Sequence, residues 1–109
     1  MMQNENIKQA INKLKDKLTI TFGSGIEIYL FGSAARGDYQ LYSDIDILVL
    51  VPFELNNTIE EQIIDTAYDI ELEYGVVFGI VAYSKDYWYS RISQHTPLYK
   101  NVRREGITV

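Results

Sequence analysis

Residues 30–51, LFGSAARGDYQLYSDIDILVLV, decide the fold predicted for this chain. The second half of this stretch, residues 44–51 (DIDILVLV), is β-branched and nearly continuously apolar, which predicts a central strand covered on both faces. Residues 26–31 alternate with period two and predict a neighbouring strand. Gly32 and Ser33 end that strand and predict a turn, and a polar, glycine-containing connection follows.

Two amphipathic helices are predicted outside this stretch. Apolar side chains recur at helical spacing over residues 4–18, and again over residues 59–74 after the natural helix caps at 56–58. The end of the second helix, IELEY at 70–74, also alternates with period two, but the length of the periodic segment favours helix.

The C-terminal third predicts one more strand and little regular structure after it. Residues 76–83 form the strand, Ser84 caps a short helix, and Pro97 begins an irregular tail. The predicted fold class is therefore α/β (α+β), with a small mixed sheet of three or four strands flanked by helices. One domain is expected to span residues 1–109.

Composition excludes several classes of protein. Of the 109 residues 47% are hydrophobic, which is too many for a disordered chain, and no apolar run approaches the ~20 residues of a membrane-spanning helix. The chain has no cysteine and no visible secretory signal, which is typical of a cytoplasmic protein. A net charge of −5 argues against nucleic acid as the main partner and is compatible with carboxylates gathered around cations.

Asp44 and Asp46 are the first candidate site residues. They begin one strand with a single residue between them, so their side chains are expected on the same face with Cα atoms ~6.6 Å apart. Two carboxylates at that distance repel each other unless a cation lies between them, and Mg²⁺ prefers one or two such ligands. The pattern alone is explained about as well if Asp44 caps a strand end and Asp46 is solvated at a sheet edge.

Three further residues suit phosphate recognition. Glycine at position 32 lets a phosphate approach the backbone, the Ser33 hydroxyl can donate a hydrogen bond to it, and Arg36 can form a fork with its oxygens. Each of these residues taken alone is more often part of an ordinary turn or surface.

Together the motifs resemble a known family. Gly32-Ser33, ten further residues, Asp44, one residue and Asp46 are similar to the signature of the DNA polymerase β-like nucleotidyltransferase superfamily. The surrounding FGSAARGDYQLYSDIDILV resembles in particular the minimal nucleotidyltransferases (MNT) of the MntA-like antitoxin type.

This resemblance implies a function. It implies transfer of a nucleoside monophosphate, AMP from ATP, to a hydroxyl of a partner protein, with a HEPN-type toxin as that partner. Asp44 and Asp46 would ligate two Mg²⁺ ions and act in catalysis, and Gly32 and Ser33, with help from Arg36, would bind the nucleotide phosphates.

One departure from the family pattern concerns a third carboxylate, which the resemblance places on the next strand, facing the pair. Residues 76–83 (VVFGIVAY) contain no acidic residue. Glu71 or Glu73 could fill this role only if residues 70–74 form a strand, and a helix would leave them on an exposed face. The alternative function is therefore a catalytically impaired module of the same fold that acts by binding a partner.

Overall fold

A four-stranded mixed sheet organises the computed structural model, which describes residues 2–37 and 44–109, with side chains from residue 5 onward. The strand order is β3-β2-β1-β4. The central strand β2 (Ile45–Val51) pairs antiparallel with β1 (Glu27–Phe31) and parallel with β3 (Phe78–Ser84). The short β4 (Ile107–Thr108) pairs antiparallel with β1. The predicted small mixed sheet is confirmed.

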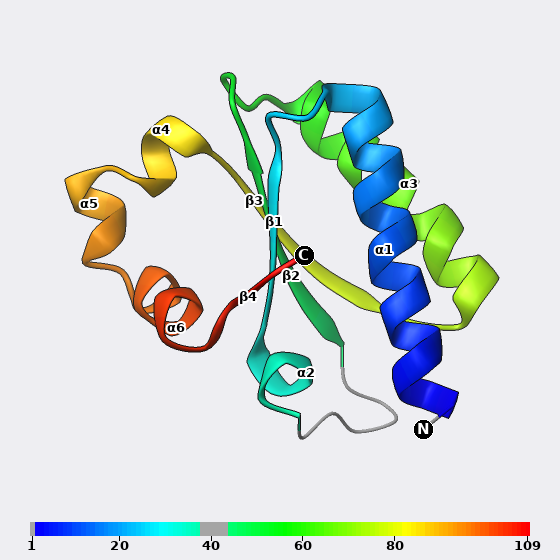
Figure 1. Ribbon diagram of the computed structural model, residues 1–109. Helices are drawn as coiled ribbons and strands as arrows, with labels where there is room; N and C mark the ends of the chain where they lie inside the picture. Colours follow the sequence, from blue (N-terminus) through cyan, green and yellow to red (C-terminus); the bar gives the residue numbers. More distant parts are fainter. Residues whose placement is uncertain (1, 38–43) are drawn as a thin grey trace.

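Two long helices cover one face of the sheet, α1 (Met2–Phe22) and α3 (Asn57–Tyr74) (Figure 1). Every second residue of β2 points toward them and is fully buried, because side chains alternate between the two faces of a strand. These residues are Ile45, Ile47, Val49 and Val51. They form the main core with the apolar stripes of the two helices.

The other face of the sheet is partly covered by three short helices: α4 (Lys85–Trp88), α5 (Arg91–Gln94) and α6 (Pro97–Glu105) (Figure 1). A second cluster of buried residues lies between them and the sheet, made of Leu48, Leu50, Trp88, Tyr99 and Val102. Because Asp46 is two residues before Leu48, its side chain points to this second face.

The boundaries of α3 follow its capping residues. The Asn56 side chain accepts a hydrogen bond from the Ile59 amide at 2.9 Å, and Gly75 ends the helix in the left-handed conformation with φ 65°. The helical prediction for 70–74 is confirmed. The predicted N-terminal helix is also confirmed and extends to Phe22, one residue before the left-handed Gly23.

Three local predictions are wrong. Residues 97–105 are a helix instead of an irregular tail, because Thr96 caps it and Pro97 occupies the first helical turn, where proline is well tolerated. The single short helix predicted after Ser84 is two helices, because Ser90 caps the second. The predicted turn at Gly32 and Ser33 is a short helix, α2 (Gly32–Arg36). None of the helices described is long and apolar enough to cross a membrane.

Candidate functional site

Asp44 and Asp46 border one small space on the second face of the sheet. In the parallel register Asp46 pairs with Gly79 of β3. A Cβ atom placed on Gly79 would lie 3.0 Å from Asp46 Oδ1 and 3.8 Å from Asp44 Oδ2. The prediction that the two carboxylates lie on the same face is therefore confirmed, and they can lie this close to β3 because residue 79 has no side chain.

The charge on Asp46 is disfavoured by its surroundings. Partial burial raises the pKa of its carboxyl group first, and the negative charge of Asp44 raises it further. The positive charge of Arg36 lowers it, and the carboxylate of Glu105 raises it again. Repelling carboxylates of this kind attract cations, and the positive charge of Arg36 offsets only part of the repulsion, because the net shift of the pKa is upward.

Gly32, which directly follows β1, lies against the Asp46 carboxylate on the other side of β2. Its φ is 74°, a backbone conformation that residues with a side chain rarely adopt. A Cβ atom there would overlap the Asp46 carboxylate. Phe31, the residue before it, pairs with Asp46 across the antiparallel ladder. Ser33 follows in α2 and is half-buried. The structure thus brings the glycine of the predicted phosphate site next to the predicted metal ligands.

Glu105 completes this arrangement and is the residue that sequence reasoning missed. Its Oε1 accepts a hydrogen bond from the Gly32 amide at 3.1 Å and one from Arg36 Nη1 at 3.2 Å. Its Oε2 also accepts from Arg36 Nη1 at 3.3 Å. Glu105 is 73 positions from Gly32. A single acidic residue so far along the chain carries no local signal of this contact.

Glu71 and Glu73 have other contacts. Glu71 accepts a hydrogen bond from the Phe78 amide at 2.7 Å, and Glu73 forms an ion pair with Lys13 at 3.1 Å. Both lie on the helix α3, so the strand that would have brought one of them to the pair does not form. Within residues 2–37 and 44–109, no three Asp, Glu, His or Cys side chains are gathered closely enough to hold a metal ion. Residues 38–43, part of the predicted polar connection between the motifs, lie outside the described residues.

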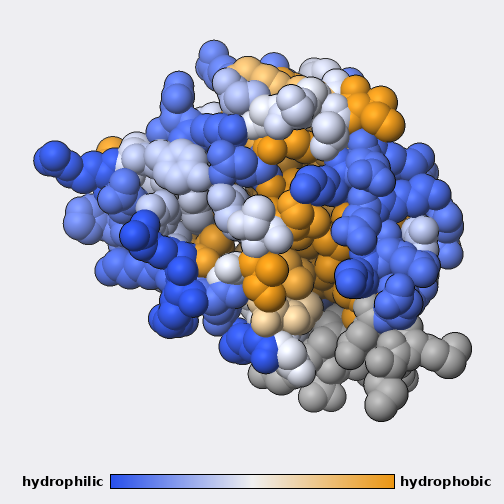
Figure 2. Space-filling view, in the orientation of Figure 1, coloured by the Kyte–Doolittle hydropathy of each residue, from blue (hydrophilic) through white to orange (hydrophobic). Residues whose placement is uncertain are grey.

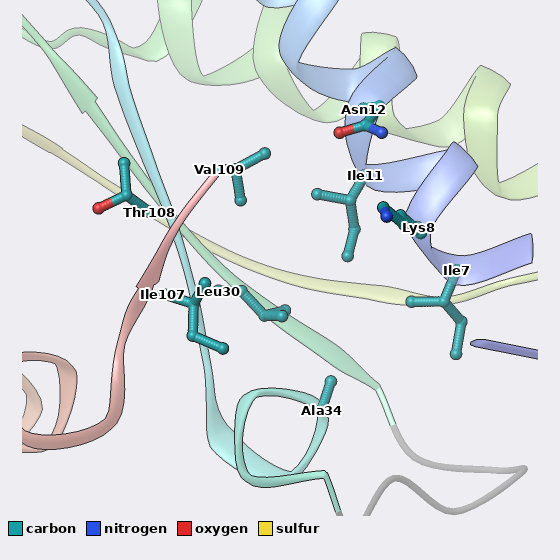
Figure 3. A pocket seen from close by; sticks show the side chains of 9 residues that line it. All are labelled: Ile7, Lys8, Ile11, Asn12, Leu30, Ala34, Ile107, Thr108 and Val109. Carbon is teal, nitrogen blue, oxygen red and sulfur yellow. The ribbon is translucent and has the colours of Figure 1, made fainter. Parts of the chain in front are cut away.

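An apolar cavity of about 320 Å³ lies apart from the carboxylates. Side chains of α1, β1, α2 and the C-terminal strand line it, as Figure 3 shows: Ile7, Lys8, Ile11, Asn12, Leu30, Ala34, Ile107, Thr108 and Val109. It is seen as part of an apolar band that runs between the polar surfaces of the molecule in Figure 2. Neither Asp44 nor Asp46 contributes to its lining.

The family of this protein follows from comparison of its sequence with known proteins. The model of the nucleotidyltransferase domain family matches residues 7–102, and the chain belongs to that family. Two proteins of Methanocaldococcus jannaschii, both provisionally named protein adenylyltransferases, are similar in sequence. One is 35% identical over 97% of this chain and 96% of its own length, and the other is 38% identical over 66% of each chain. These relatives support a transferase.

Solved structures of similar fold belong to toxin–antitoxin pairs. A chain of a toxin–antitoxin crystal structure with AMP-PNP superposes with a TM-score of 0.59 and 25% identity, covering 87% of this chain and 68% of that one. A chain from the complex of tri-AMPylated Shewanella oneidensis HEPN toxin with MNT antitoxin superposes with a TM-score of 0.54 and 27% identity. That match covers 99% of this chain and 71% of the other. Both of these structures are thus toxin–antitoxin complexes, and the second one pairs a HEPN toxin with an MNT antitoxin.

Proposed function

We propose that this protein transfers AMP from ATP to a hydroxyl group of a partner protein. One observation carries the proposal: the carboxylates of Asp44 and Asp46 both lie beside Gly79, and that of Asp46 also lies against Gly32, the first residue of the predicted phosphate-binding motif. Membership of the nucleotidyltransferase family and the similarity to protein adenylyltransferases support the reaction class. We place this activity in the cytoplasm, where ATP is available and a cysteine-free chain is at no disadvantage.

The residues present fit magnesium. The donors are oxygen atoms of two carboxylates, which magnesium prefers, and a bound cation would offset the repulsion that the charge of Asp44 exerts on Asp46. Asp44 and Asp46 would hold the metal, two ions being expected. Bound magnesium would neutralise negative charge that develops on the reacting phosphate group.

The remaining site residues would position ATP. The Gly32 amide and the Arg36 guanidinium are both hydrogen-bond donors directed to one place, where they now meet a carboxylate oxygen. Ser33 adds a hydroxyl in the next position of α2. These groups would bind the phosphates and orient the α-phosphate toward the acceptor hydroxyl, which is the main contribution that a protein makes to this kind of transfer.

The proposed acceptor is a HEPN-type toxin, with this protein as its antitoxin. The support is the similarity to a chain of the Shewanella oneidensis complex, in which the HEPN toxin is tri-AMPylated. An acceptor on a separate protein also suits this site, because Asp44 is exposed and Asp46 is partly exposed, which leaves the pair approachable.

A second candidate function is partner binding without catalysis. Gly79 favours it, because this position faces Asp46 on the next strand and offers no third carboxylate to activate the acceptor hydroxyl. In that case the protein would neutralise its partner by contact alone, and ATP would not be consumed.

A transfer assay tests the proposal. The protein is incubated with magnesium, ATP labelled on the α-phosphate, and a lysate of its source cells or a purified HEPN protein from those cells. Label is expected on one protein band, and the Asp46→Asn variant should abolish it, whereas Asp65→Asn, the same change on the exposed face of α3, should not. Absence of label with a folded protein and a competent acceptor would support the binding function. Full activity in Asp46→Asn would refute the assignment of Asp46 as a metal ligand.

A further inference from the structure

The Glu105 carboxylate occupies a position that matters for the proposed function. It lies at the C-terminal end of α6. It accepts one hydrogen bond from the Gly32 amide at 3.1 Å and two from Arg36 Nη1, at 3.2 and 3.3 Å. Its side chain is only 15% exposed, so it is held between α6 and α2 instead of extending into solvent. These are the same two donors that the proposed function assigns to a phosphate group.

The negative charge of Asp46 repels the carboxylate of Glu105. Glu105 is close enough to Asp46 to disfavour the charge on that residue, and Asp44 adds to the same repulsion. Arg36 supplies the compensating positive charge. A third negative group beside an acidic pair is retained at an electrostatic cost, which the hydrogen bonds from Gly32 and Arg36 offset.

A carboxylate oxygen and a phosphate oxygen present the same chemistry to an amide and a guanidinium. Both are anionic acceptors, and Arg36 can bind either one as a fork. We propose that the Glu105 carboxylate and a phosphate group of the incoming nucleotide compete for the Gly32 amide and the Arg36 guanidinium, so that Glu105 must turn away when the nucleotide binds. This inference rests on the proposed function for the identity of the anion as a nucleotide phosphate.

The local structure allows Glu105 to move. It is the last residue of α6, and Gly106 follows it with its amide bonded to the Val102 carbonyl at 2.7 Å. The strand β4 beyond pairs with β1 at two positions, and the next residue, Val109, donates its amide hydrogen bond to the Ile28 carbonyl at 2.9 Å. Rotation of the Glu105 side chain about its own torsions frees both donors and leaves the backbone of α6 and β4 in place.

Competition predicts tighter anion binding when Glu105 is removed. Binding of inorganic tripolyphosphate and of ATP with magnesium is measured by calorimetry on the full chain, with folding checked by circular dichroism. Glu105→Ala is expected to bind both anions about tenfold more tightly than the wild type, which is the usual effect of one charge-assisted contact. Glu105→Gln serves as a second variant that keeps the side-chain volume and should show a smaller gain in the same direction.

Two controls make the outcome specific. Glu73→Ala removes an ion-paired glutamate from α3 and should change anion binding less than twofold. The gain from Glu105→Ala should disappear in an Arg36→Ala background, because the contested donor is then absent. Unchanged or weaker binding in Glu105→Ala would overturn the inference, as would no tripolyphosphate binding in any variant, and either result would make Glu105 a structural residue that orders Arg36.

The inference and the proposed function can fail separately. Tighter tripolyphosphate binding in Glu105→Ala without any transfer of labelled AMP would uphold the competition and refute the adenylyltransferase. Transfer by the wild type with no gain in Glu105→Ala would do the reverse.

Discussion

Asp46 on β2 lies directly opposite Gly79 on β3, and the glycine leaves room for the carboxylate. The side chains of paired residues on parallel strands point to the same face of a sheet. Any side chain at position 79 would therefore enter the space between Asp44 and Asp46. The family resemblance places a third carboxylate on this strand, facing the pair, and here that position is a glycine.

Replacing Gly79 with alanine is expected to lower AMP transfer by about tenfold or more, because a displaced reacting group costs at least that much. The new Cβ atom would lie 3.0 Å from Asp46 Oδ1 and push the carboxylate out of position. Gly25→Ala is a matched control, since its Cβ would meet Pro52 at the same 3.0 Å far from the carboxylates. Initial rates of labelled AMP transfer measure the effect, and equal losses in the two variants would contradict it.

Replacing Glu71 and Glu73 with glutamine is expected to leave transfer unchanged. Glutamine at 71 can still accept the hydrogen bond of the Phe78 amide, and Glu73 loses only an exposed ion pair with Lys13. Glu71→Ala should instead lower the free energy of unfolding by about 1 kcal/mol, because the Phe78 amide loses its partner. Transfer assays and urea denaturation measure the two effects. A large loss of transfer in either glutamine variant would place that carboxylate in the site.

Stability should depend on pH through Glu27. Burial raises the pKa of this carboxyl group, but hydrogen bonds from Tyr29, Tyr89 and Lys85 outweigh burial, and the net shift is downward from 4.5. A carboxyl group with a lowered pKa stabilises the fold above its unfolded pKa and loses that contribution as the pH falls through its folded pKa. Glu27→Gln should therefore cost about 1 kcal/mol at pH 7.

Denaturation curves at pH 7 and at pH 3 check this expectation. The difference in unfolding free energy between wild type and Glu27→Gln should shrink at the lower pH, where Glu27 begins to be protonated. A difference that is constant or larger at pH 3 would show that the contacts of Glu27 do not depend on its charge.

Trp88 is expected to hold the three short helices onto the sheet. It is 4% exposed, and its ring lies 5.0 Å from that of Tyr99 and 6.0 Å from that of Tyr83. Trp88→Ala should lower the free energy of unfolding by about 3 kcal/mol, as for other large buried aromatic residues. Tyr87→Ala, on the same helix but 40% exposed, should cost much less. Thermal unfolding followed by circular dichroism compares the two, and similar losses would contradict this role.

The elements around the motif could be predicted because their signals are local. The strand at 45–51 follows from its composition, and α3 follows from a period, a cap at Asn56 and a stop at Gly75. The shared face of Asp44 and Asp46 needs only strand alternation. No long-range information was required for any of these.

The rest depends on contacts that are distant in sequence. The Asp46 carboxylate on the adjacent strand leaves no space for a side chain at Gly32, and Glu105 reaches the site from 69 residues beyond Arg36. Pro97 predicts the start of an irregular tail, although proline after a capping threonine commonly begins a helix. A single proline is compatible with an irregular tail and with the start of a helix. Which of the two forms depends on whether the residues after it can pack against a partner surface.

The alternation of side chains along β2 fixes the position of Asp46 relative to the core. Ile45 and Ile47, on either side of Asp46, have no exposed surface and are enclosed by α1 and α3. The strand cannot slide by one residue without turning these side chains out of the core. Asp46 is consequently held in place as firmly as the interior of the molecule, and its register opposite Gly79 follows from the packing of the core on the other face of the sheet.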